Sequence, residues 1–201
     1  MVQRPATGSD SGAHLTARCS RLVGFLALAV LVAIAGSAAS AQPSYRRADW
    51  RHWIDADRDC QDTRQEVLIE ESLIQVTLSP DGCRVLAGQW LDPYGGEVYT
   101  DPQQLDIDHV VPLGAAHRMG GWRWSRTRKA EYANDLSDPE HLIAVSARMN
   151  RQKGDRGPAT WLPPRTRSQC RYVRAWQAIA TRWALALSPA DQAAVHQRCV
   201  E

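Results

Sequence analysis

Two short stretches of the chain carry acidic, imidazole and amide side chains at spacings that suit chemistry on water. Asp106, Asp108 and His109 stand within four consecutive residues of an apolar-alternating stretch, where unpaired charges would be costly in a plain core strand. Further along, His141 precedes four apolar residues, and Asn150 follows nine residues after it. Carboxylate and amide oxygens suit hard divalent cations, and imidazole has a pKa near neutrality. The pattern predicts a site where a cation and a histidine act together.

The elements that must position these residues form a strand–strand–helix unit. Residues 105–111 read as a strand and residues 142–145 as a second strand. Ser146 then caps a helix that ends near Gly154. We expect Asp108 at the end of the first strand and Asn150 on the helix packed across it, so that their oxygens converge on one cation.

This arrangement resembles the HNH, or ββα-metal, nuclease superfamily, and most of all the secreted HNH proteins related to the C-terminal domain of GmrSD-type restriction endonucleases. The resemblance rests on DIDHVVPL (106–113), HLIAV (141–145) and NRQKGDRGP (150–158), followed by WLP (161–163). It extends upstream through DCQDTR (59–64) and GQW (88–90), and so covers most of the chain after residue 41.

The resemblance implies a role for each matching position. Asp108 resembles the metal-binding acid, His109 the general base, and Asn150 the second metal ligand. The middle position, commonly Asn in the superfamily, is His141 here; a histidine can also hydrogen-bond a carbonyl and so brace the loop that orients the catalytic histidine, although ordinary packing of His141 is an equal alternative. The cofactor implied is one divalent ion, Mg²⁺ or otherwise Mn²⁺ or another metal.

Three further residues surround this set. Arg151 and Lys153, beside Asn150, are predicted to contact neighbouring phosphates. Asp106 is predicted to orient a partner of the site rather than to bind the ion. The expected activity is hydrolysis of phosphodiester bonds in DNA, with RNA as a further substrate, at low sequence specificity because the chain has no recognisable reader module.

Two other interpretations stay open. One is a catalytically silent nucleic-acid-binding protein on the same ββα frame, against which the intact Asp108, His109 and Asn150 argue. The other is a secreted toxin or effector nuclease neutralised by a partner. No repeat or delivery domain in the sequence supports this interpretation. No protein partner is deducible from the sequence.

The first 41 residues are predicted to be an export signal. Three arginines precede an apolar run at residues 22–36, and Ala39-Ser40-Ala41 offers a cleavage site before Gln42. We expect a secreted protein with no stable membrane association after cleavage. The alternative is an uncleaved N-terminal membrane anchor, although the strictly apolar run is shorter than the roughly 20 residues that a span needs.

Four cysteines follow the cleavage site, and an even count in an exported chain indicates two disulfides. Pairing Cys60 with Cys83 and Cys170 with Cys199 closes each loop within one region. The other two connectivities stay open. No C-x-x-C pair is present, so a structural zinc knuckle is not expected.

The charges divide along the chain. The 201 residues carry a net charge of +2, yet residues 42–108 hold 6 basic and 14 acidic side chains, whereas residues 109–201 hold 15 basic and 7 acidic ones. This division suggests one polyanion-facing surface. The basic cluster at residues 126–129 is expected to be either a solvated face or a nucleic-acid contact.

The remaining pattern predicts an α+β fold in a single domain, residues 42–201, with the ββα core at about 104–155. Thr63 and Glu66 form a capping box for a helix at 64–72. A small antiparallel β region follows at 74–100. Flanking helices are expected at 126–134, at 168–187 and from Ser188-Pro189 onward. His52 and His117 are expected at the surface.

Overall fold

An antiparallel pair of strands lies at the centre of the residues that position the predicted site. The computed structural model describes residues 41–199, so the predicted signal peptide lies outside the described residues apart from Ala41. β5 (Leu105–His109) pairs with β6 (Leu142–Ser146) over their full length, with Asp108 opposite Ile143. Both strands are largely buried.

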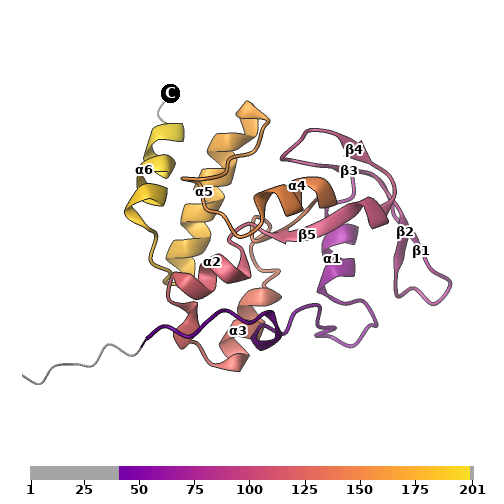
Figure 1. Cartoon of the computed structure of the whole chain (residues 1–201). Helices are drawn as coiled ribbons and strands as arrows, with labels where there is room; N and C mark the ends of the chain where they lie inside the picture. Colours follow the sequence, from indigo (N-terminus) through magenta and orange to yellow (C-terminus); the bar gives the residue numbers. More distant parts are fainter. Residues whose placement is uncertain (1–40, 200–201) are drawn as a thin grey trace, which may run out of the picture. The chain divides into compact units, whose positions relative to one another are not determined.

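Helices cover both faces of this pair. α4 (Ala147–Lys153) follows β6 directly and packs on both strands, and α1 (Thr63–Glu70) packs on β6 from the other side. Figure 1 shows α4 and α1 on opposite sides of β5. Beneath β5 and β6, Leu105, Ile107 and Leu142 join Val67 and Leu68 of α1 in an apolar cluster. Strand order and helix placement therefore give the predicted strand–strand–helix unit.

The other helices build a second, larger core. They are α2 (Leu113–Arg118), α3 (Arg126–Ala133), α5 (Thr166–Arg182) and α6 (Pro189–Arg198), with short 3₁₀ turns η1 (Arg47–Asp49), η2 (Pro102–Gln104) and η3 (Gly121–Arg123). α5 buries Tyr172, Trp176 and Ile179, which gives the stripe that its sequence predicts, and it lies beside α6 (Figure 1). α2 was not expected from the sequence.

Local capping residues explain where most helices begin. The side chains of Ser125, Ser146 and Ser188 accept hydrogen bonds from the first turns of α3, α4 and α6, as predicted. The capping box at α1 is wrong: Asp62 is the N-cap and accepts from the backbone of Arg64 and Gln65. A carboxylate one residue earlier satisfies the same free N–H groups.

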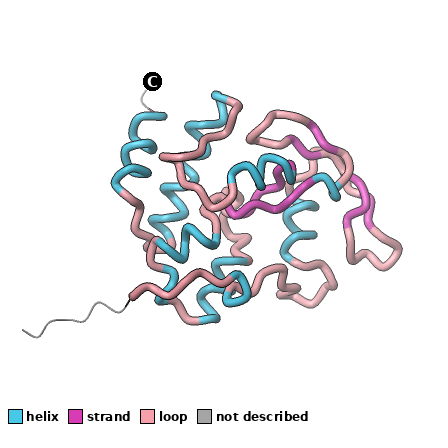
Figure 2. The backbone as a smooth tube through the Cα atoms, viewed as in Figure 1, coloured by secondary structure: helices cyan, strands magenta, loops and turns pink. Residues whose placement is uncertain are grey.

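The small β region is less regular than expected. It consists of two separate pairs, β1 (Thr77–Leu78) with β2 (Val85–Ala87) and β3 (Trp90–Leu91) with β4 (Val98–Tyr99). Figure 2 shows these short strands at one end, apart from the helices α5 and α6. Between β2 and β3 lies Gly88, where a Cβ would lie only 2.5 Å from the Trp90 ring.

Two disulfides connect the cysteines as the favoured pairing predicts, Cys60 with Cys83 and Cys170 with Cys199. The α+β class and the antiparallel β region are also confirmed. Within residues 41–199, no helix combines the length and the apolar character needed to cross a bilayer.

Candidate active site

Strand and helix periodicities bring two pairs of polar side chains together. Asp106 and Asp108 are two residues apart on β5, so they share one face of the strand, and Asn150 and Lys153 are one turn apart on α4. Asn150 Nδ2 donates to Asp106 Oδ2 at 3.0 Å, and Lys153 Nζ donates to Asp108 Oδ1 at 2.8 Å. The helix is thus fixed to the strand by two polar contacts in register.

Asp108 is enclosed by donors. Its side chain is 4% exposed, and besides Lys153 it accepts a hydrogen bond from the Tyr94 hydroxyl at 2.8 Å. Lys153 is fully buried and also donates to the His109 carbonyl at 2.9 Å. Burial raises the pKa of Asp108, while the adjacent Lys153 ammonium and the Tyr94 hydroxyl stabilise its charged form. The result is an internal ion pair.

His109 has a defined tautomer and no charge at neutral pH. Its Nε2 lies 3.0 Å from the Ala133 carbonyl, which can only accept, so Nε2 carries the hydrogen and Nδ1 keeps a free lone pair. The ring stacks on Trp53 at a centroid distance of 5.8 Å. Burial, with His141 nearby, lowers the pKa of His109 well below its usual value.

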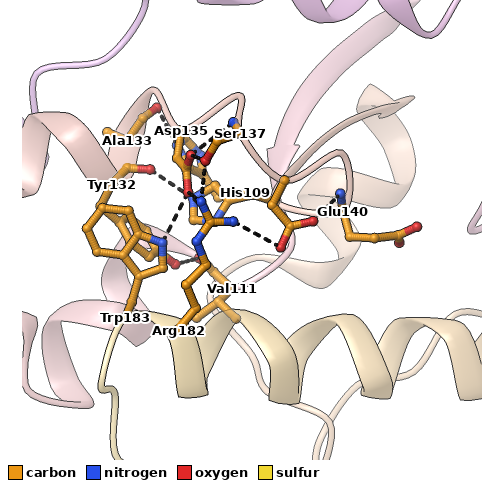
Figure 3. Close-up of polar contacts among 11 residues, drawn as sticks. His109, Val111, Tyr132, Ala133, Asp135, Ser137, Glu140, Arg182 and Trp183 are labelled. Atoms are coloured by element: carbon orange, nitrogen blue, oxygen red, sulfur yellow. Dashed lines mark hydrogen bonds and ion pairs between the residues drawn. The ribbon is translucent and has the colours of Figure 1, made fainter.

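The Ala133 carbonyl belongs to the last residue of α3, and the loop that follows α3 is held from the end of α5. Trp183 Nε1 donates to Asp135 Oδ2 at 3.2 Å, and the Arg182 guanidinium lies 3.4 Å from the same oxygen and also contacts Ser137. Figure 3 shows these side chains reaching the loop from the end of α5, with His109 behind it. The orientation of the imidazole therefore depends on contacts far from the strand itself.

His141, directly before β6, contacts the end of α3. It is 1% exposed, its Nε2 lies 2.8 Å from the Tyr132 carbonyl, and the Tyr132 hydroxyl donates to the Val111 carbonyl. Burial lowers the pKa of His141. Its position agrees with the bracing interpretation, and the cavity described next does not include it.

A cavity of about 240 Å³ gathers three of the residues that the sequence analysis selected. Asp108, His109 and Asn150 all line it, together with Tyr45 and Arg47 from the N-terminal segment. Asn150 donates one of its two amide hydrogens to Asp106, and no hydrogen bond to its amide oxygen is seen among the described residues. Three predicted residues from two elements therefore share one opening.

The structure corrects one predicted contact and one expected location. Lys153 cannot face a phosphate because it is fully buried against Asp108, which is a wrong prediction for this residue. Arg151 lies on the exposed face of α4, and its phosphate contact stays a prediction. His117 is 3% exposed rather than at the surface, and its Nε2 lies 2.7 Å from the Pro43 carbonyl.

Several residues at the site escaped the sequence reasoning. Tyr94 lies within a turn and gave no signal of its contact with Asp108. Trp53 and Arg47 precede the motifs by more than fifty residues, and only the fold brings them to His109. The Asp108–Lys153 pair could have been found in the sequence. D-x-D places two carboxylates on one face of a strand, and N-x-x-K places an amide and an ammonium on one face of a helix, so the two pairs can meet.

The fold and the site together define an α+β protein with two disulfides and a small cavity at a strand–strand–helix unit. In sequence, the chain is 37% identical over 155 residues to an "Uncharacterized secreted protein" of Arthroderma benhamiae; the match covers 77% of this chain and 74% of the fungal protein. The chain belongs to the same family as this fungal secreted protein. No protein-family model and no solved structure matches the chain.

Proposed function

We propose that the chain is a secreted, metal-dependent endonuclease of the HNH type that hydrolyses phosphodiester bonds in DNA, with RNA as a further substrate. The observation that carries the proposal is the single cavity lined by Asp108, His109 and Asn150. Secretion is supported by the fungal relative's description and by the two disulfides.

His109 would act as the general base. Its Nε2–H is directed at the Ala133 carbonyl and its pKa is depressed, so the ring is neutral and Nδ1 can accept a proton. Nδ1 would take the proton of a water whose oxygen attacks phosphorus. The bond from phosphorus to the 3′ oxygen breaks on the opposite side, and that oxygen is protonated by solvent, which leaves a 5′-phosphate and a 3′-hydroxyl.

The donor set fits one hard divalent cation. Asp108 and Asn150 line the same cavity, and Asn150 keeps a free amide oxygen. Both Asp108 oxygens accept one hydrogen bond, and each oxygen keeps a second lone pair. These two residues would hold Mg²⁺ or Mn²⁺, while Asp106 fixes the Asn150 amide; when bound, such an ion supplies charge stabilisation for the phosphoryl and leaving oxygens.

The test uses protein produced from the full-length gene in a host that forms disulfides. Supercoiled plasmid and a structured RNA are incubated with it in Mg²⁺, in Mn²⁺ and in EDTA. We expect nicked and then linear plasmid with a metal ion and intact plasmid in EDTA.

Two matched variants exclude a contaminating nuclease. His109→Ala should lose the activity, whereas His196→Ala, on an exposed position of α6, should keep it. Plasmid and RNA that both stay intact with either ion would refute the proposal. Equal activity of the His109→Ala preparation would refute it too.

A further inference from the structure

A second and larger hollow lies next to the candidate active site. It has a volume of about 840 Å³ and is lined by the segment from Arg47 to Ile54 and by the start of α3. Three exposed arginines border it: Arg47, Arg51 and Arg126. Asp49 is the one acidic residue in this lining, and it is engaged by Arg46 at 2.9 Å. The hollow is therefore a basic one.

One residue joins this hollow to the active-site cavity. Arg47 lines both of them. His52 lies 2.9 Å from the Trp50 carbonyl through Nδ1 and 3.1 Å from the Arg47 guanidinium through Nε2. A carbonyl accepts, so Nδ1 carries the hydrogen and Nε2 accepts from Arg47. The next residue, Trp53, stacks on His109. The same segment thus forms the hollow and touches the catalytic histidine.

The lining of the hollow is apolar as well as basic. It includes Ala48, Ile54 and Ala130 beside the three arginines. Arginines along a groove suit the phosphates of a single strand, and apolar lining beside them suits the faces of unpaired bases. The volume falls within the range of pockets that enclose one drug-sized molecule, about 300–1,000 Å³, and a few nucleotides of one strand match that size better than a duplex does.

We propose that the hollow bordered by Arg47, Arg51 and Arg126 binds a single-stranded segment of nucleic acid and leads it through Arg47 to the His109 cavity. This inference rests on the proposed function and names its substrate form: the strand is unpaired next to the bond that is cut. Arg51 and Arg126 bind only the strand, whereas Arg47 also reaches the reacting phosphate.

The first test measures binding without cleavage. In a His109→Ala background and without metal, a fluorescein-labelled dT12 and a hairpin duplex of equal length are titrated and followed by anisotropy. Arg51→Ala/Arg126→Ala should weaken dT12 binding roughly tenfold and lower the slope of log Kd against log salt by about one to one and a half, as expected for two lost phosphate contacts on a single strand. Hairpin binding should change less.

The matched control removes two exposed arginines elsewhere, Arg84→Ala/Arg174→Ala, with the same change in net charge. It should bind dT12 within twofold of the parent. Equal losses in the two double variants would overturn the proposal, because net charge alone would then explain binding. An equal loss for dT12 and hairpin would overturn the single-strand assignment.

A second measurement separates this inference from the proposed function. Hydrolysis of bis(p-nitrophenyl) phosphate, which is too small to fill the hollow, should be unchanged by Arg51→Ala/Arg126→Ala when His109 is intact, while KM for dT12 cleavage rises. If the parent hydrolyses nothing but the anisotropy results hold, the nuclease proposal fails and the binding site stands. If hydrolysis occurs and anisotropy shows no difference from the control, the binding site fails alone.

Discussion

The ββα unit and the small β region differ in what they bury. In the ββα unit the charged or titratable side chains are buried, with at most 6% exposed: Asp108, His109, His141 and Lys153. In the β region large apolar side chains are exposed instead, including Leu73, Ile74, Leu86, Leu91 and Val98. Each region thus departs in its own way from the usual distribution, apolar inside and polar outside.

The difference indicates how each region is stabilised. Burying charge costs free energy unless each group has a partner, and here Asp108 has Lys153 and Tyr94, while His109 has the Ala133 carbonyl. The β region has two-residue and three-residue strands that bury little, and it carries the Cys60–Cys83 disulfide. The first region depends on the pairing of Asp108 with Lys153 and Tyr94, and the second on a covalent link.

The largest expected effect is on catalysis at the buried imidazole. His109→Ala should lower the rate of DNA cleavage roughly 10²–10⁴-fold, the usual contribution of a general base, while metal binding is largely kept. Metal affinity from titration calorimetry and single-turnover rates separate the two roles. If His109→Ala abolished metal binding while turnover at saturating metal stayed normal, His109 would be a ligand and not a base.

The same residue predicts the pH dependence. Because the folded pKa of His109 is well below its usual value, the rate should rise with pH and reach its plateau already below neutrality. Stability has the matching sign: a depressed pKa contributes stability above the unfolded value of about 6.5, and this contribution is lost as the pH falls below it. A rate that still rises between pH 7 and 8 would contradict the assignment.

The next effect tests the pairing of buried charge. Lys153→Met leaves the Asp108 carboxylate buried without its ammonium and should cost about 3–5 kcal/mol of unfolding free energy. Asp108→Asn/Lys153→Met removes both charges and should recover most of that loss. Urea unfolding of the three proteins measures it. A double variant as unstable as Lys153→Met would mean that packing, rather than charge, is what Lys153 supplies.

Much of the ββα unit could be predicted from the sequence because its signals are local. Strand alternation, the Ser146 cap and the Gly154 stop determine β5, β6 and α4 and so bring Asp108 and Asn150 together. The predicted location of Lys153 was wrong because a lysine next to a proposed phosphate site is ordinarily expected at the surface. Its burial depends on Asp108 lying opposite it, which only the packed register of helix and strand decides.

The contributions of Arg47 and Trp53 could not be predicted for a different reason. Each belongs to an irregular segment whose path is set by long-range contacts, such as the hydrogen bond from the Ile54 amide to Asn134 Oδ1. Contacts of this kind have no periodicity in the sequence. The strand boundaries in the β region could not be predicted for a similar reason. Its apolar stretches indicate longer strands than the turns and Gly88 permit.

A smaller effect is expected at the covalent link of the β region. Cys60→Ala/Cys83→Ala opens a loop of sequence separation 23 and should cost roughly 3 kcal/mol. Hydrogen exchange should accelerate mainly at the β1 and β2 amides, because local opening needs little apolar surface to be exposed there. Cys170→Ala/Cys199→Ala, with a separation of 29, is the matched control and should not affect β1 and β2. Uniform acceleration in both variants would contradict the division into two regions.

The smallest effect is expected where the two regions meet. Glu71 is the C-cap residue directly after α1, and its Oε2 accepts a hydrogen bond from the Ala144 amide of β6 at 2.7 Å. Burial raises the pKa of Glu71 to about 7. A raised pKa means that the folded state holds the proton more tightly, so stability falls as the pH rises from the unfolded value of about 4.3 through 7. Glu71→Gln keeps an acceptor for Ala144 without the charge. Because Glu71 is partly exposed, solvent screening makes the cost of its charge smaller than the pKa shift alone implies. We expect Glu71→Gln to raise the free energy of unfolding by about 1 kcal/mol at pH 8 and to leave it unchanged at pH 4.5. Thermal unfolding across this range measures it, and a gain that is independent of pH would show that the carboxylate is not the source.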